Sequence, residues 1–291
     1  LVLGWEFYVP LLIALVLIVL AVPVWAVLGV TSILMLHFSG VLPLSLLGEA
    51  LFDGIDAFAL IAVPLFILTG DVLVRTGLSH KLLDVAEALV GGFRSGFGTA
   101  TVLVCGFFAC ISGSDAAGAA GVGRMTIDRL VAQGYTRPYA CALVAAGACT
   151  GILIPPSIAY IIIGLILGIS ASTLFLAAMV PGLLIMLTIM ITNIIMNRIK
   201  GYENADQGFS FRRLWKAVYE GRYALIVPFI ILGGIYSGIF TPTEAAAVAV
   251  VTTIIIGLFQ RTITLADFPK MLASSAKVNG VIVPIIAFSL P

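Results

Sequence analysis

Two short polar segments lie inside long apolar stretches of this sequence, at points where the backbone cannot remain a regular helix. The first, Ser112–Asp115, combines two serines, a glycine and an aspartate, residue types that loosen a helix. The second, Thr150–Ser157, contains two consecutive prolines, which remove two amide donors. Unwound backbone exposes carbonyl oxygens that bind cations, and the N-termini of half-helices attract anions. These segments therefore predict ion binding.

The first segment is the centre of an apolar stretch, Ser95–Gly123, whose two ends both adjoin clusters of basic residues. Because basic residues mark the cytoplasmic side of a membrane protein, both ends should lie on that side. We interpret the stretch as a re-entrant hairpin that turns at Ser112–Ser114, a backbone tolerated at membrane depth only inside protein or along a cavity. The alternative is a pair of short core helices joined by a packing turn.

The second segment interrupts another apolar stretch, Pro138–Gly168, which is longer than one membrane thickness. The helix must unwind at Pro155 and Pro156, and Ser157 stands where it can cap a new half-helix. An ordinary proline kink is the alternative, and it is the interpretation that a single proline would favour.

Two irregular backbones at one membrane depth need each other and a polar occupant, so we expect the two segments to meet around a cation. The role of Asp115 stays open between holding a cation and capping the outgoing hairpin helix. The predicted ion-binding residues are Ser112, Gly113, Ser114, Thr150, Gly151, Ile154 and Pro155. The predicted substrate-binding residues are Ser114, Asp115, Pro156 and Ser157.

The composition places these segments in a membrane protein. Of the 291 residues, 61% are hydrophobic and 10% are charged, whereas a soluble domain is about 45–50% apolar and about 25% charged. Apolar runs close to the roughly 20 residues that cross a bilayer recur along the chain and indicate an all-α, multi-pass protein. The net charge of +1 gives no sign of nucleic-acid binding. His37 and His80 lack the spacing of metal ligands, and no nucleophile and base can be paired, so an enzyme is not expected.

The positive-inside rule orients the chain, because its basic residues fall into four clusters that we expect in the cytoplasm. The clusters are Arg75, Lys81 and Arg94; Arg124, Arg129 and Arg137; Arg198, Lys200, Arg212, Arg213, Lys216 and Arg222; and Arg261, Lys270 and Lys277. Two amphipathic stretches beside these clusters, Leu78–Leu89 and Leu265–Val278, are interpreted as arms along the membrane surface.

Two further acidic residues have structural interpretations. Asp71 precedes Arg75 by four residues, which is the spacing of an ion pair within a helix. Glu244 follows Thr241 at the start of an apolar helix, where its carboxylate complements the helix dipole and the threonine can cap.

Several motifs, in this order and over nearly the whole chain, closely resemble the large membrane subunit of tripartite ATP-independent periplasmic (TRAP) transporters. They are Pro64–Asp71 (PLFILTGD), Ser112–Ser114 with small residues through Gly123, Gly134-Tyr135, Gly151–Ser157 (GILIPPS) and Phe240–Ala247 (FTPTEAAA).

This resemblance implies an elevator-type transporter with two inverted repeats, each contributing a hairpin tip and a broken helix to the site. It also implies sodium as the coupling ion, no other cofactor, and a carboxylate substrate. The implied partners are a small membrane subunit and a periplasmic substrate-binding protein, in the bacterial inner membrane. A related ion-coupled carboxylate carrier that works without a binding protein is the alternative. A passive channel would need a ring of polar pore-lining residues, which is not visible, and a scaffold subunit would not need the tip and the break.

The resemblance divides the chain into five segments. These are the N-terminal scaffold helices (1–56), a pre-hairpin helix with an amphipathic arm (57–94), the first transport repeat (95–197), a cytoplasmic loop (198–222) and the start of a second inverted repeat (223–291). Both Ala224–Gly234 and Val281–Ser289 echo Ala59–Gly70, but no second Gly-Ser tip or Pro-Pro break follows them. The second repeat is therefore expected to be incomplete, and the chain to be part of a longer protein.

Overall fold

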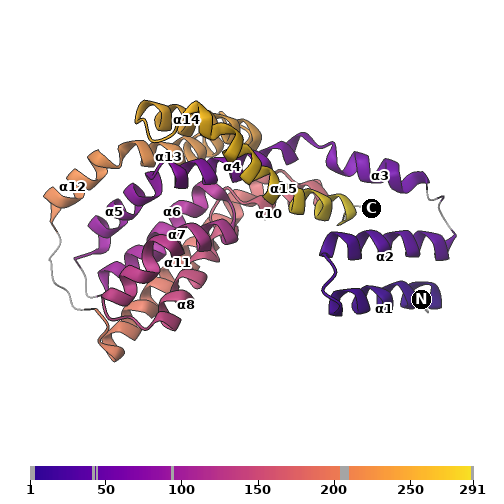
Figure 1. The fold of residues 1–291 in the computed structure, drawn as a ribbon, viewed down its shortest axis with the longest axis horizontal. Helices are drawn as coiled ribbons and strands as arrows, with labels where there is room; N and C mark the ends of the chain where they lie inside the picture. The colour runs from indigo at the N-terminus through magenta and orange to yellow at the C-terminus, as the bar shows by residue number, and fades with distance from the viewer. Residues whose placement is uncertain (1–3, 41–42, 44, 93–94, 204–209, 290–291) are drawn as a thin grey trace. The chain divides into compact units, whose positions relative to one another are not determined.

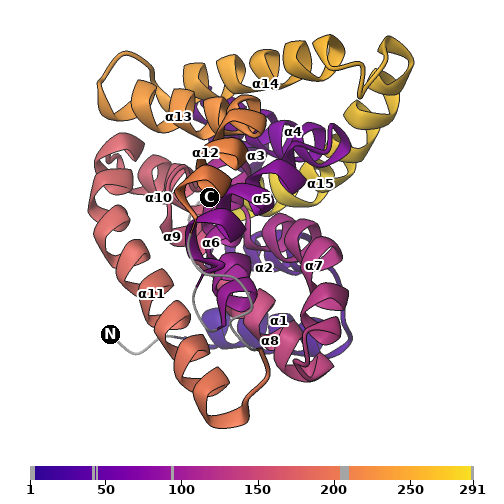
Figure 2. The ribbon, with the colours of Figure 1, turned by 90° about the vertical axis from the view of Figure 1, so that its left-hand side faces the viewer.

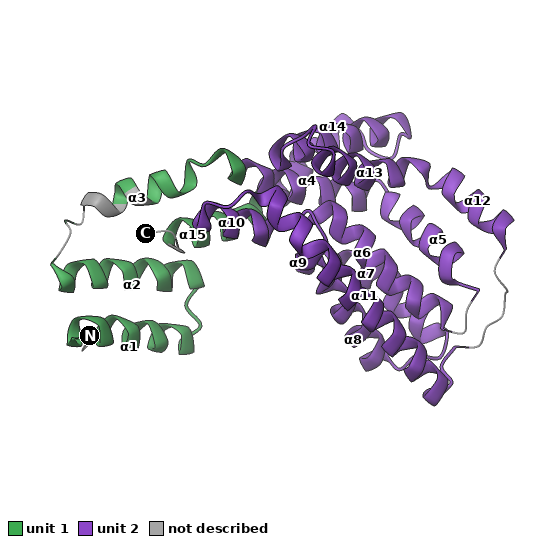
Figure 3. Cartoon of the chain, turned by 180° about the vertical axis from the view of Figure 1, so that it is seen from behind, with its two compact units in different colours: residues 1–60, 276–291 green, residues 61–275 purple. Residues whose placement is uncertain are grey.

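A computed structural model describes residues 4–40, 43, 45–92, 95–203 and 210–289. Within these ranges every regular element is a helix (Figure 1), which confirms the all-α prediction for this part of the chain. The chain forms two compact units, residues 1–60 with 276–291 and residues 61–275 (Figure 3).

The smaller unit packs α1 against α2, and Phe288 near the C-terminal end of the last described helix lies against α2. Trp5 and Phe38 meet edge to face with ring centroids 5.6 Å apart, and Trp25 stacks on Phe288 at 6.3 Å. Many large apolar side chains of α1, including Leu12, face outward, as expected for a surface that meets lipid or other helices. The elements that begin in this unit are α1 (Trp5–Val19), α2 (Val24–Ser39), α3 (Ser45–Ile55) and the 3-10 turn η1 (Phe58–Ile61).

The larger unit is built around α6, of which all residues except Leu103 and Phe107 are buried. It packs against α4, α5, α7, α8, α9, α11 and α13, and the long α11 runs beside α6 and α9 (Figure 2). The elements are α4 (Ala62–Arg75), α5 (Leu78–Val90), α6 (Gly96–Ser112), α7 (Asp115–Ala132), α8 (Arg137–Ala148), α9 (Thr150–Leu153), α10 (Ile158–Leu167), α11 (Ala171–Lys200), α12 (Phe211–Glu220), α13 (Arg222–Tyr236), α14 (Pro242–Phe259), the 3-10 turn η2 (Leu265–Asp267) and α15 (Phe268–Ser289), whose C-terminal part belongs to the smaller unit.

Five helical stretches of the described residues are long and apolar enough to cross a membrane. Helices α12 and α13 form a sixth candidate, bent by 75° where they join. The five stretches are Phe58–Arg75, Arg137–Leu167, Ala171–Lys200, Pro242–Phe259 and Leu265–Phe288. Their length and composition support the prediction of a multi-pass membrane protein.

Two local predictions are confirmed. Arg75 Nε donates to Asp71 Oδ2 at 2.9 Å, and Thr241 and Glu244 form a reciprocal capping box at the start of α14. Leu78–Leu89 is helical as predicted, within α5, but its apolar side is buried and α5 packs along α6. Protein therefore covers this apolar face, and the position of the arm along the membrane surface stays a prediction.

Helices α6 and α7 form the hairpin, and their outer ends lie together. The guanidinium of Arg129, in the last turn of α7, is 4.3 Å from the centre of the Phe97 ring in the first turn of α6. At about 1.5 Å per residue each helix is about 25 Å long, less than the roughly 30 Å of a membrane core, so the tip can stay at membrane depth. A chain that enters from one side therefore returns to the same side.

We predict that cysteines placed at positions 94 and 124 react with an impermeant thiol reagent from the same side, the cytoplasmic one. Arg94 lies outside the described residues, so for this position the prediction comes from the sequence alone. The measurement uses a background in which the four native cysteines are replaced. Labelling of the two positions from opposite sides would exclude a re-entrant hairpin.

Candidate functional site

The hairpin turns at the predicted position. Helix α6 ends at Ser112, and Gly113 follows with a φ of 60°, in the left-handed region that favours glycine. Ser114 is extended and starts α7 as its N-cap, with Oγ accepting from the Ala117 amide at 3.4 Å. The tip is therefore a two-residue connection rather than a loop.

The second irregular segment separates α9 from α10. Ile154 is extended, and the chain stays out of helical structure until Ile158 starts α10. Ser157 stands at the N-cap position as predicted, but its hydroxyl makes no capping bond. This hydroxyl is buried and has no hydrogen-bond partner within the described ranges. A buried hydroxyl without a partner is costly, so a ligand oxygen or ion at this place would satisfy it.

The tip and the break are in direct contact. The Ile158 amide donates to the Gly113 carbonyl at 3.3 Å. A Cβ atom at Gly113 would lie 2.8 Å from the Pro156 carbonyl oxygen, so the two backbones leave no room for a methyl group. A Cβ atom at Gly151 would lie 2.7 Å from Asp115 Oδ1 and 3.1 Å from the Asp115 amide. The structure thus brings together Gly113 with Pro156, and Asp115 with Gly151.

Other predicted residues turn their side chains elsewhere. The Ser112 hydroxyl donates to Phe108 O at 3.1 Å, and the Thr150 hydroxyl donates to Gly147 O at 2.6 Å, each within its own turn of helix. These hydroxyl oxygens keep lone pairs, so they can still accept or coordinate. Pro155 is buried, and Ile154 is buried with its side chain toward Gly106 of α6, so it has only backbone to offer an ion.

Asp115 is not the cap of α7, because Ser114 has that role. Its carboxylate interacts with the backbone of Ile152, but Oδ1 is buried and lacks a well-formed hydrogen bond among the described residues. Of the two roles that the sequence left open, Ser114 takes the cap, and the buried Oδ1 of Asp115 is left available to a donor or a cation.

Two glycines that sequence reasoning did not assign to the site let neighbouring helices approach it closely. A Cβ atom at Gly70 of α4 would lie 3.0 Å from Ser112 Cβ, and one at Gly182 of α11 would lie 3.0 Å from the Leu153 carbonyl carbon. In the sequence each glycine directly follows another residue that weakens a helix, in Thr69-Gly70 and Pro181-Gly182. This pairing is the sequence feature that could have indicated a close approach of backbones.

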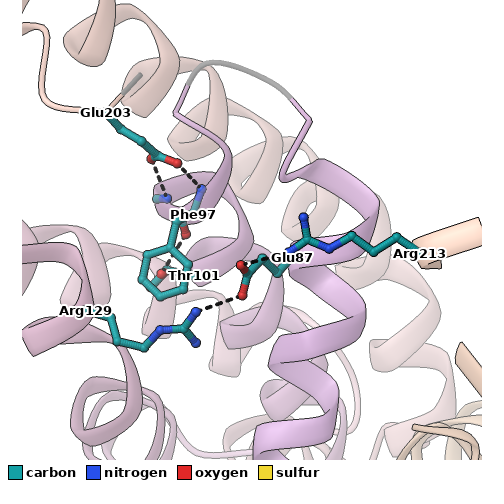
Figure 4. A network of polar contacts seen from close by, with 7 residues as sticks. Glu87, Phe97, Thr101, Arg129, Glu203 and Arg213 are labelled. Carbon is teal, nitrogen blue, oxygen red and sulfur yellow. Dashed lines mark hydrogen bonds and ion pairs between the residues drawn. The ribbon is translucent and has the colours of Figure 1, made fainter. Parts of the chain in front are cut away.

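The opposite end of the hairpin is held by Glu203, which lies just after α11 (Figure 4). Its carboxylate accepts from the amides of Phe97 and Gly98, at 2.8 and 3.4 Å, in the first turn of α6. It also accepts from the Tyr135 hydroxyl at 3.0 Å. Burial, together with the Glu203 carboxylate, raises the pKa of Tyr135, so the phenol stays protonated and continues to donate. A carboxylate at a helix N-terminus also complements the helix dipole.

Further contacts fix the same end of the hairpin. Asn197 of α11 bonds the Glu203 backbone in both directions, at 2.8 and 3.0 Å. Glu87 of α5 pairs with Arg129 at 3.0 Å and with Arg213 at 3.4 Å (Figure 4). The base of the hairpin is thereby tied to α5, α11 and α12.

We predict that Glu203→Gln lowers the stability of the protein by about 1–3 kcal/mol, because charge-assisted bonds to the start of α6 are weakened. Thermal unfolding in detergent, followed by intrinsic fluorescence, measures the change. Asp128→Asn is the matched control, since Asp128 forms an exposed ion pair with Arg137 at 3.4 Å and such pairs contribute about 0–1 kcal/mol. Equal effects of the two substitutions would contradict a special role for Glu203.

The chain is a helical, multi-pass membrane protein in which a hairpin tip meets a broken helix. Such non-helical backbone is tolerated at membrane depth only where protein or a water-filled cavity surrounds it. The comparison with protein families makes the class specific. Residues 11–290 match the model of the DctM component of the tripartite ATP-independent periplasmic transporters. The chain therefore belongs to this family, as the sequence motifs predicted.

Characterised relatives are similar over most of this chain. The isethionate TRAP transporter permease protein DctMQ of Oleidesulfovibrio alaskensis is 35% identical over 93% of the chain and 43% of its own length. The C4-dicarboxylate large permease protein DctM of Pseudomonas aeruginosa is 39% identical over 81% of the chain and 56% of its own length. The sialic acid large permease protein SiaM of Vibrio cholerae is 34% identical over 80% of the chain and 55% of its own length. The chain spans about half the length of these relatives.

Proposed function

We propose that the chain forms part of the permease of a secondary importer that couples the entry of an organic acid to sodium. The contact between the hairpin tip and the break, joined by the Ile158 amide and the Gly113 carbonyl, is the observation that carries the proposal. The proposed partners are a small membrane subunit and a periplasmic substrate-binding protein, and the proposed location is the bacterial inner membrane. Membership in a tripartite transporter family supports both.

We assign sodium to the irregular backbone. Unwound carbonyl groups coordinate sodium in transporters, and the tip and the break supply such groups within one contact region. The buried Oδ1 of Asp115 adds a negative oxygen on the same side as Gly151. The proposed ion-binding residues remain Ser112, Gly113, Ser114, Thr150, Gly151, Ile154 and Pro155, and Asp115 now belongs with them.

We assign the substrate anion to the two helix starts that meet at the site. The N-terminus of α7 begins after Ser114 and that of α10 after Ser157, and each presents the positive end of its dipole. The buried Ser157 hydroxyl is available to donate to a carboxylate, and Pro156 lines the same place. Asp115 would repel an anion, so its negative charge has to be balanced by the cation first. This order of events links sodium binding to substrate binding.

Because the tip and the break contact each other, we further propose that α6, α7, α9 and α10 move together as the carrier part of an elevator. The deep burial of α6 and the close approach of α4 at Gly70 support a rigid carrier. An inverted second repeat belongs to the same proposal.

Uptake into proteoliposomes tests the function. The transporter, its small subunit and its binding protein are supplied with labelled C4-dicarboxylates, sialic acid or isethionate, which are the substrates in the names of relatives. Isethionate is a sulfonate, so the panel also tests whether the anion must be a carboxylate. Uptake that needs the binding protein and an inward sodium gradient is expected. Uptake without the binding protein would favour the alternative carrier, and uptake that ignores sodium would reject the coupling.

A further inference from the structure

Helix α12 lies in the segment 198–222 that the sequence suggested was a cytoplasmic loop, and one of its faces is aromatic. Phe211, Trp215 and Tyr219 follow each other at intervals of four residues, so they share one side of the helix. Their exposed fractions are 69%, 66% and 63%. A row of large aromatic side chains is unfavourable in water, so we expect another molecule to cover this face of the helix.

The opposite face of α12 is fixed to the rest of the larger unit. Arg213 pairs with Glu87 of α5 at 3.4 Å, and Glu220 pairs with Lys81 at 3.6 Å. Directly after the helix, a Cβ atom at Gly221 would lie 2.9 Å from the side chain of Val85. With 3.6 residues per turn, Arg213 and Glu220 point about 100–180° away from the aromatic row. The aromatic face is therefore turned away from α5.

Basic side chains border the aromatic row. Arg212 and Lys216 are exposed, are four residues apart and lie next to the row on the helical surface. Phe211, Arg212 and Trp215 line one open surface pocket. The guanidinium of Arg222 lies 4.4 Å from the centre of the Tyr219 ring and adds a positive charge at the end of the helix. Aromatic rings beside basic groups match the level of a membrane where acyl chains meet phosphates.

The angle between α12 and α13 indicates that α12 lies parallel to the membrane surface. The two helices meet at 75°, and α13 is an apolar helix with Pro228 and Gly234 buried inside the unit. A helix that crosses a bilayer is tilted by about 20° from the normal. With α13 in the membrane, α12 therefore runs close to the plane of the membrane surface, and its basic residues place it on the cytoplasmic side.

We propose that α12 binds anionic phospholipid headgroups of the cytoplasmic leaflet, with Arg212 and Lys216 on the phosphates and Trp215 among the upper parts of the acyl chains. The cytoplasmic leaflet is negatively charged, which matches the basic border of the aromatic row. An apolar protein surface would offer Arg212 no anionic group, and Lys216 has only a long, exposed ion pair with Glu220 at 3.8 Å, so a lipid is the better occupant. The proposal rests on the membrane orientation of α13 and not on the transported cargo or the sodium site.

Fluorescence quenching of Trp215 tests the proposal. The chain has three tryptophans, so Trp5→Phe with Trp25→Phe leaves Trp215 as the only one. The protein is reconstituted with its small subunit into phosphatidylcholine vesicles that contain a minor share of phosphatidylglycerol, with bromine on the acyl chains of one lipid or the other. We expect quenching by the brominated phosphatidylglycerol to exceed its share of the lipid, with a local enrichment of about fivefold for each bound basic residue.

Variants separate headgroup binding from mere contact with lipid. Arg212→Gln with Lys216→Gln should return the enrichment to the bulk value, while quenching by brominated phosphatidylcholine persists. Arg137→Gln with Arg198→Gln removes the same charge elsewhere and should leave the enrichment unchanged. A variant in which Trp25 is the only tryptophan is measured in the same way, and its quenching reports that the protein is correctly inserted in each preparation.

Three results would overturn the proposal. Absence of quenching by either brominated lipid would mean that another protein surface or water covers the aromatic face. Quenching that appears only when the small subunit is omitted would identify that subunit as the occupant. Quenching in proportion to lipid content, unchanged in the Arg212→Gln, Lys216→Gln variant, would show a helix that touches lipid without selecting headgroups.

Discussion

Gly113→Ala should nearly abolish sodium-dependent uptake, whereas Gly168→Ala should preserve most of it. The two glycines have almost the same backbone conformation, with φ values of 60° and 65°. An alanine in this region costs about 1–2 kcal/mol at either position. At Gly168 nothing lies within 4 Å of the new methyl group, but at Gly113 the Pro156 carbonyl oxygen would lie 2.8 Å away and the Ile158 amide 3.3 Å away. The difference between the variants therefore measures the contact of the tip with the break.

The size of the effect follows from the atoms involved. Both neighbours of the new methyl are backbone atoms, which cannot rotate away, so the tip must separate from the break. Overpacking of this kind costs about 1–3 kcal/mol, which corresponds to roughly 5–150-fold in the affinity for an ion held between the two backbones. Uptake measured against sodium concentration, with protein amounts matched after reconstitution, gives this factor.

Gly151→Ala approaches the same contact from the other side. Gly151 is helical, where alanine is preferred over glycine by about 1 kcal/mol, so α9 itself should not be harmed. The methyl group would instead press on Asp115, 2.7 Å from Oδ1. Loss of uptake in both variants supports a shared site. Normal sodium affinity in Gly113→Ala and Gly151→Ala would mean that the contact is structural only.

The sequence located the tip and the break because both depend on local backbone chemistry. Glycine with serine, and two adjacent prolines, weaken a helix wherever they stand, so their positions transfer directly to the structure. The pairing was less predictable. We expected Ser112–Ser114 to face Thr150, Gly151 and Ile154. A Cβ atom at Gly151 would indeed lie 3.2 Å from the Ser114 carbonyl carbon. Gly113, however, meets Pro156 and Ile158, because helix lengths and crossing positions decide the register.

Contacts between distant segments account for most of what sequence reasoning missed. Glu203 is separated from Phe97 by 106 residues, and an acid inside a basic cluster carries no sign of its partner. An amphipathic pattern also does not tell whether lipid or protein covers its apolar face, and in α5 protein covers it. In the segment 198–222 the basic residues were used for topology alone, and the aromatic spacing of α12 was overlooked.

Replacing both Pro155 and Pro156 with alanine should reduce uptake and sodium affinity together, although the protein becomes no less stable. The prolines have no backbone N–H to donate and separate α9 from α10, so residues 154–157 remain outside helical structure. Alanines would supply two amides and allow one continuous helix, which satisfies its own backbone in a membrane. In a regular helix each carbonyl group points along the helix axis and accepts a hydrogen bond from the amide four residues later, so it is not free to coordinate an ion.

The hydrogen bond between the hairpin and α10 explains why the effect should reach the tip. At present the Ile158 amide donates to Gly113 O at 3.3 Å, since the residues before it are not helical. In a continuous helix the same amide would donate to the carbonyl four residues earlier, that of Ile154. Gly113 would then lose its donor, and the tip would lose its attachment to the broken helix.

Pro228→Ala is the matched control for this double substitution. Pro228 is buried inside the unbroken helix α13, so its replacement restores an amide without closing a break. We expect Pro228→Ala to leave the sodium dependence of uptake unchanged and the double variant to raise the sodium concentration for half-maximal uptake by at least about tenfold, equivalent to about 1.4 kcal/mol. Thermal stability of both variants is measured in the same detergent. If the double variant is as stable as the original protein and transports with the original sodium affinity, the break is incidental and the ion site must lie elsewhere.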